Sequence, residues 1–253
     1  REVGFYGTAY PLASAMVIVL GVFGYLYLPL ASRIDGADDT DSVEPIYQIT
    51  TRWIYVLTFP LFLLFLVFPA DVIAIVFSPA YSSGGIALSI LSLGFFTNAA
   101  FGRSRETLSA VGTTRFVLFS NVGAVVVNII LNLLLIPQYG FIGAAIASAL
   151  SYLVLNLAAY FFLRQQHGIT PFSSSMVRVA IVLPAILIPV AYGLNSLISL
   201  TQYTLIPFLT GTAVVTIIIT YLAGGTRPED AAIVSLAEDA IGTDLSWISN
   251  KLK

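Results

Sequence analysis

The feature that most constrains the fold is a series of long apolar stretches joined by short links. There are seven, and they cover residues 7–31, 53–76, 85–103, 116–136, 141–163, 177–197 and 203–223. A helix needs about 20 mostly apolar residues to cross about 30 Å of hydrocarbon. Strands of a membrane β-barrel would instead be about ten residues long with alternating polarity. The sequence therefore predicts an all-α integral membrane protein with seven transmembrane helices.

The composition supports a partnership with the lipid bilayer. Charged side chains make up 9% of the 253 residues, whereas soluble domains carry about 25%. The chain therefore has too few charged residues to cover a water-soluble surface. The net charge of −2 and the lack of a basic stripe argue against nucleic acid as a partner. Cysteine is absent, which excludes disulfide frameworks and thiol catalysis.

Basic residues predict the orientation of the chain, because cytoplasmic loops are enriched in Lys and Arg. The links at 78–84, 137–140 and 195–202 contain neither residue. The opposite side holds all but one of the eleven, Arg1 being the exception. We therefore expect a multi-pass protein of the cell membrane, with the N-terminus of this segment outside and the C-terminus cytoplasmic. The residues on the cytoplasmic side are Arg33, Arg52, Arg103, Arg105, Arg115, Arg164, Arg178, Arg227, Lys251 and Lys253.

Three asparagines mark one face of the fourth stretch. Asn121, Asn128 and Asn132 are spaced by seven and four residues, which places them on the same side of a helix. An amide exposed to lipid is costly, so this face should meet another helix or a water-filled cavity. Two interpretations stay open, namely hydrogen bonds that join helices and the lining of a substrate path.

The third stretch carries an arginine near its inner end. If its helix continues to Val111, five residues share one face, and Arg105 lies on it. The five are Gly94, Asn98, Gly102, Arg105 and Ser109. A guanidinium at that place suits phosphate oxygens in an inward-facing cavity, or else anchors the helix at the inner surface. Arg103 and Glu106, three residues apart, are predicted to pair with one another.

No nucleophile–base set, phosphate loop or metal-ligand cluster is visible in the sequence. We therefore expect a transporter and not an enzyme, with no catalytic residues, no metal site and no cofactor.

Several segments, taken in order, resemble a known family. They are EVGFY at 2–6, AY at 9–10, PLAS at 29–32, VFSPAY at 76–81, LSAVG at 108–112 and NIILNLLLIPQYGFIGAA at 128–145. Together they are similar to the second half of polysaccharide-biosynthesis membrane proteins, the lipid-linked oligosaccharide flippases of the multidrug/oligosaccharidyl-lipid/polysaccharide (MATE-like) exporter superfamily. The likeness covers about residues 1–165.

The resemblance implies the C-terminal bundle of a fourteen-helix, two-bundle transporter. Residues 1–165 would then form part of that bundle with five spans, and 166–225 would add two transmembrane helices. A start signal at Pro228 and apolar residues at helical spacing predict a cytoplasmic amphipathic tail over 226–253. The N-terminal half of the same protein, absent from these 253 residues, would be a partner.

The function implied by the resemblance is alternating access for a polyprenyl-(di)phosphate-linked oligosaccharide, moved from the cytoplasmic to the outer leaflet. This lipid-linked substrate would be a binding partner and would occupy the cavity. Its phosphate would be attracted by Arg105, Arg103, Arg52 and Asn98, with Asn128 and Asn132 on the facing wall or in a packing seam. These residues are inferred from helix faces, because the family offers no position-specific motif for them.

Other functions remain open at this point. A cation-coupled drug or metabolite exporter of the same superfamily would need acids within the membrane. A non-transporting scaffold for glycan assembly would tolerate changes in the cavity. A membrane glycosyltransferase or ligase would need catalytic acids at one interface.

Overall fold

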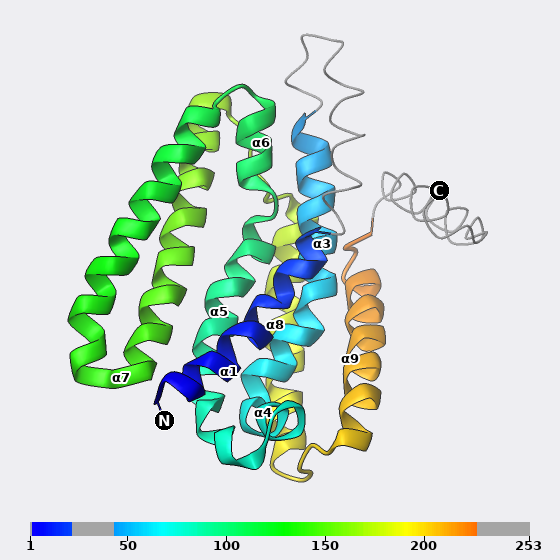
Figure 1. Cartoon of the computed structure of the whole chain (residues 1–253). Helices are drawn as coiled ribbons and strands as arrows, with labels where there is room; N and C mark the ends of the chain where they lie inside the picture. The colour runs from blue at the N-terminus through cyan, green and yellow to red at the C-terminus, as the bar shows by residue number, and fades with distance from the viewer. Residues whose placement is uncertain (1, 22–42, 227–253) are drawn as a thin grey trace.

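The computed structural model describes residues 2–21 and 43–226, and within these the chain is helical. Figure 1 shows the helices running roughly alongside one another, with the start of α1, the turn within α7, η2 and the α8–α9 link at one end. The elements are α1 (Glu2–Ser14), α3 (Val43–Val67), α4 (Pro69–Val76), η2 (Pro79–Gly84), α5 (Gly85–Phe101), α6 (Ser104–Ala110), α7 (Thr114–His167), α8 (Ser174–Asn195) and α9 (Gln202–Leu222).

The segment labelled α7 is a hairpin of two helices. Its backbone leaves the helical region at Gly140, with φ of 55° and ψ of −133°, a conformation that only glycine adopts readily. Figure 1 shows the two arms side by side, joined at that turn. We call Thr114–Tyr139 the first arm and Phe141–His167 the second arm. A Cβ on Gly143 would collide with the carbonyl of Leu135, so the arms approach closely at the turn.

The hairpin accounts for the predicted fourth and fifth spans, and the all-α membrane fold class is confirmed. Within the described residues, six helical segments are long and apolar enough to cross a membrane, counting α7 as one. The other predicted spans correspond to the helix at Glu2–Gly21, to α3 with α4, to the Pro79–Ala110 segment, and to α8 and α9. The division of the chain into domains stays a prediction.

The second predicted span is two helices. The first of them, α3, begins ten residues earlier than expected, at Val43, and ends at Val67. Pro69 then stands at the start of α4, where its missing N–H costs nothing.

An aromatic seam joins α3 to α5 in the core. The rings of Phe62 and Phe96 are stacked with centroids 4.1 Å apart, and Tyr55 packs on Phe96 at 4.9 Å. Helix α5 also packs against α1 and the α7 hairpin, while α3 packs against α8 and α9. The apolar core thus lies around α3 and α5, and the α7 hairpin stands to one side (Figure 1).

The expectation of one continuous helix from residue 85 to Val111 is wrong. Helix α5 ends at Phe101, and Gly102 has a φ of 60° before α6 begins at Ser104. A Cβ at this glycine would fall on the hydroxyl of Thr51 in α3. The close crossing with α3 therefore breaks the helix, and Arg105 does not continue the face of Gly94 and Asn98.

Two predictions extend beyond the described residues. The first span was expected to reach residue 31, and the description of that segment ends at Gly21. The amphipathic tail was expected over 226–253, of which only residue 226 is described.

Candidate functional site: a polar cavity between α1, α6 and the α7 hairpin

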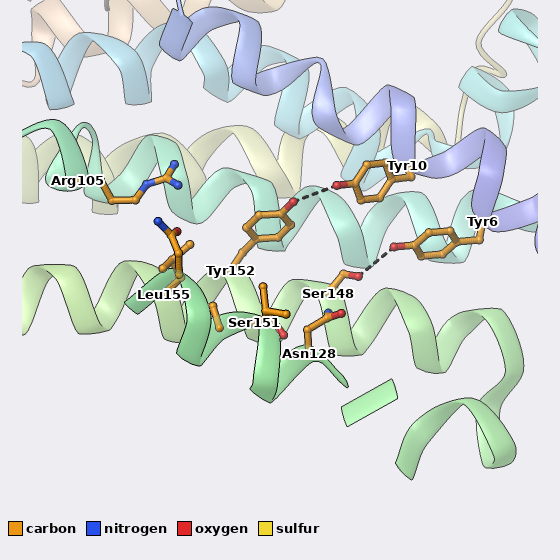
Figure 2. A pocket seen from close by; sticks show the side chains of 11 residues that line it. Tyr6, Tyr10, Arg105, Asn128, Ser148, Ser151, Tyr152 and Leu155 are labelled. Atoms are coloured by element: carbon orange, nitrogen blue, oxygen red, sulfur yellow. Dashed lines mark hydrogen bonds between the residues drawn. The ribbon is translucent and has the colours of Figure 1, made fainter. Parts of the chain in front are cut away.

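A cavity of about 440 Å³ lies between α1, α6 and both arms of α7. Figure 2 shows side chains from these helices converging on it. Eight of the eleven lining residues carry polar groups, and the apolar members are Ala124, Val125 and Leu155. The polar members are Tyr6 and Tyr10 from α1, Arg105 from α6, Asn121 and Asn128 from the first arm, and Ser148, Ser151 and Tyr152 from the second arm.

Arg105 is the charged member of this lining. Short helix α6 carries it into the cavity, and two glycines with positive φ, Gly102 and Gly112, bracket that helix. The side chain is half-buried, and among the described residues its guanidinium has no hydrogen-bond or ion-pair partner. The planar guanidinium thus presents its N–H donors to the cavity without a countercharge. This arrangement suits the binding of an oxyanion such as phosphate.

Two hydroxyl pairs line the cavity beyond Arg105, with the Tyr10–Tyr152 pair toward its middle and the Tyr6–Ser148 pair toward the opposite end. The Tyr6 hydroxyl lies 2.9 Å from the Ser148 hydroxyl, and the Tyr10 hydroxyl lies 3.1 Å from that of Tyr152. Figure 2 shows these pairs linking α1 to the second arm of α7, with Arg105 and Tyr6 toward opposite ends. One end of the cavity therefore offers a cation, and the other offers groups that both donate and accept hydrogen bonds.

The asparagine face of the first arm meets this cavity, as one of the two interpretations requires. Asn121 and Asn128 are in the lining. The amide nitrogen of Asn132 donates to the side-chain oxygen of Asn128 at 2.9 Å, and Asn132 is not itself part of the lining. Asn132 thus orients Asn128, and its predicted contact with substrate stays a prediction.

The other predicted residues lie outside the cavity lining. Arg52 is 1% exposed and donates to the Ser175 hydroxyl at 2.9 Å, because α3 packs against α8 at this point. Arg103 donates to the Leu20 carbonyl at 2.7 Å and pairs with Glu106 at 3.1 Å. The predicted pairing of Arg103 with Glu106 is confirmed, and the substrate-binding role of the two arginines stays a prediction.

Asn98 is buried in the seam between α5 and the second arm, where Asn156 joins the two helices. The amide of Asn156 donates to Thr97 at 2.8 Å and lies 3.3 Å from the Asn98 side-chain oxygen. It also donates to the Tyr152 carbonyl at 2.9 Å. Asn98 therefore supports the wall that carries Tyr152 and does not face the cavity itself.

The residues that sequence reasoning missed are the cavity hydroxyls and Asn156. Tyr6 and Tyr10 are four residues apart, and so are Ser148 and Tyr152. That spacing puts each pair on one helix face. This four-residue spacing is visible in the sequence, but tyrosines near the end of a span are also typical of the membrane interface. Which helix face meets a cavity depends on how the helices pack.

Comparisons with known proteins agree with a transport role for relatives of this chain. It is 26% identical over 204 residues to a protein of Haloferax volcanii described as "Probable low-salt glycan biosynthesis flippase Agl15", a match that covers 79% of this chain and 42% of the relative. It is 30% identical over 155 residues to the "Probable flippase AglR" of the same organism, covering 59% of this chain and 32% of the relative. An uncharacterized membrane protein of Methanocaldococcus jannaschii is 33% identical over 126 residues, which cover 47% of this chain and 24% of that protein.

The chain thus spans less than half the length of the curated relatives it matches. No solved structure matches it. A model of the family described as lipid II flippase MurJ matches residues 10–218. Since that range covers most of the 253 residues, the chain belongs to the MurJ family of multi-pass membrane proteins.

Proposed function

We propose that this chain supplies one wall of the substrate path in a flippase for polyprenyl-phosphate-linked oligosaccharides. Such a flippase is a transporter and not an enzyme, and it would move its substrate to the outer leaflet by alternating access for glycan biosynthesis. The family supports this, and so do the relatives described as glycan biosynthesis flippases. The observation that carries the proposal is the placement of the Arg105 guanidinium in the cavity with no partner among the described residues.

Arg105 would bind the phosphate of the carrier lipid. Charge-assisted hydrogen bonds from arginine to phosphate are about twice as strong as neutral ones, and low dielectric strengthens them further. The hydroxyl and amide groups deeper in the cavity would face the glycan, whose own hydroxyls need both donors and acceptors. The lipid tail can remain in the bilayer, so a cavity of about 440 Å³ has to hold polar groups alone.

We further propose that the α6 end of the cavity faces the cytoplasm. Arg103, Arg105 and Arg115 cluster at that end, as expected for an inner surface. Exposed tyrosines occur at the other end, at Tyr81 in η2 and Tyr139 before the α7 turn, as is typical of a membrane interface. In this orientation the phosphate meets Arg105 first. Assembly with an N-terminal bundle into a two-bundle transporter also remains part of the proposal.

The test is the replacement of Arg105 in the full-length protein. Arg105→Ala should abolish transfer of lipid-linked glycan to the outer leaflet, measured as loss of surface glycan with accumulation of the lipid-linked precursor. Arg105→Lys keeps the positive charge but loses the planar guanidinium that can bind phosphate through two N–H groups, so this variant should retain part of the activity.

Arg115→Ala is the matched control, because Arg115 is an exposed arginine at the start of the first arm. It should leave transfer unchanged. Normal transfer by an Arg105→Ala protein that is expressed and inserted at the usual level would refute the phosphate role.

A further inference from the structure

The helical segment Glu2–Gly21 is in two parts, an outer part that is α1 and an inner part at residues 16–21, with a weak joint between them. Pro11 lies inside α1, and a proline removes one backbone hydrogen bond and crowds the preceding turn. At Ala15 the helix becomes a turn, and the Ala15 N–H is shared between the carbonyls of Pro11, at 3.2 Å, and Leu12, at 3.1 Å. The joint is therefore a place where the outer part, Glu2–Ser14, can change its angle.

The inner part, residues 16–21, is held at the start of α6. Arg103 donates to the Leu20 carbonyl at 2.7 Å, and the Leu20 side chain is 9% exposed. Because Arg103 immediately precedes α6, this contact ties the inner part to the helix that carries Arg105. Movement at the joint would therefore leave the phosphate end of the cavity in place.

Helix α1 is held to the second arm of α7 by two parallel rungs. Tyr6 bonds to Ser148 and Tyr10 to Tyr152, each across 142 residues of sequence. Both rungs consist of uncharged hydroxyl groups that line the cavity. Ring contacts accompany them, since Phe5 packs on Phe141 with centroids 5.4 Å apart. The rungs thus form the hydrogen-bonded part of this wall.

We propose that these rungs are a latch that the glycan itself releases, so that Tyr6, Tyr10, Ser148 and Tyr152 select a glycosylated carrier over a bare lipid phosphate. The proposal rests on the proposed function, because it assumes a phosphate at Arg105. A phosphate held there would leave the Tyr10–Tyr152 rung toward the middle of the cavity and the Tyr6–Ser148 rung toward the far end (Figure 2). The attached sugar is the part of the substrate that reaches them.

Sugar hydroxyls have the same chemistry as the latch. Each hydroxyl of the latch donates one hydrogen bond and accepts others, so a sugar can replace each rung with no polar group left unpaired. Breaking the rungs without a replacement would cost the free energy of two hydrogen bonds, of which Tyr6–Ser148 is partly buried and Tyr10–Tyr152 is exposed. Helix α1 therefore stays closed over an empty cavity and swings outward when a glycan occupies it.

The test measures the position of α1 by electron spin resonance. These 253 residues contain no cysteine, so once any cysteine elsewhere in the full-length protein is replaced by serine, spin labels can be placed at Val3→Cys on α1 and Leu150→Cys on the second arm, both exposed. The full-length protein is studied in lipid nanodiscs alone, with dolichyl phosphate, and with dolichyl phosphate glucose. Binding of each lipid is measured on the same samples by native mass spectrometry.

The glucose-bearing lipid should shift the label distance to a longer value, and the bare phosphate should not. The double variant Tyr6→Phe/Tyr10→Phe keeps the rings and removes two hydroxyls. Since one side-chain bond between membrane helices changes an equilibrium about threefold, its open-to-closed ratio without lipid should rise about tenfold. Tyr139→Phe is the matched control, because Tyr139 is exposed and outside the cavity, and it should leave the distances unchanged.

The outcomes separate the two proposals. An unchanged distance in the double variant overturns the latch whatever the lipid does. Equal opening by bare and glucosylated lipid overturns the selection of the glycan. Failure of either lipid to bind contradicts the proposed function, and the measurement without lipid still decides whether the hydroxyls hold α1.

Discussion

The close approach of α5 to the second arm of α7 depends on Gly94. A Cβ at this position would lie 2.5 Å from the Cα of Ala149 and 2.9 Å from its Cβ. Carbon atoms make favourable contact at about 3.5–4.0 Å, so the added methyl would lie about 1 Å too close. The obstacle includes backbone, which no rotamer change can move. Gly94→Ala must therefore push the two helices apart.

The magnitude follows from two opposing effects. Overpacking of a tight core costs about 1–3 kcal/mol, and alanine is favoured over glycine inside a helix by about 1 kcal/mol. The net loss of unfolding free energy should be about 0–2 kcal/mol, a change of up to about 30-fold in the folded-to-unfolded ratio. The separation would also stretch the bonds from Asn156 to Thr97 and Asn98.

The assay is unfolding of the purified protein by titration with sodium dodecyl sulfate in mixed micelles. Gly123→Ala is the matched control, because Gly123 lies in the first arm with nothing within 4 Å of an added Cβ. The control should be neutral or slightly stabilising. If Gly94→Ala unfolds at the same detergent fraction as Gly123→Ala, the close-packing argument is refuted.

Two further predictions concern the α5–α6 break and the orientation. A strained backbone typically costs about 1–3 kcal/mol. Gly102→Ala should destabilise the protein by more than this, because the added Cβ also collides with Thr51. Gly112→Ala is the control, because Gly112 has a positive φ but open space around it, and it should show the backbone cost alone. The same titration measures both, and equal shifts would contradict the role given to the crossing. For the orientation, a membrane-impermeant maleimide should label Ser83→Cys in intact cells and Thr114→Cys only after permeabilisation. The opposite pattern would reverse the proposed direction of the chain.

The fold class could be predicted from sequence because span length and apolarity are local properties. The ends of α8 and α9 lie within a few residues of the predicted spans. The break at Gly102 could not be predicted, because its cause is a residue of another helix, Thr51. A glycine inside an apolar run is tolerated in a continuous helix just as well.

The candidate site was predictable only in part. Arg105 and Asn128 were identified from charge and helix face, and both are in the cavity lining. Arg52 met the same criteria, yet it is buried against Ser175. The difference is which neighbour each helix packs against, and the sequence of one helix does not contain that information. The hydroxyl latch was missed for the same reason.

The turn at Gly140 also bears on how this protein enters the bilayer during synthesis. Only one non-helical residue separates the two arms. The link between them is therefore too short for the first arm to insert into the membrane separately from the second. Its polar face, with Asn121 and Asn128, would be a poor insertion signal alone. We therefore expect the two arms to leave the translocation machinery as a pair, with the serines and tyrosine of the second arm already beside the amides of the first.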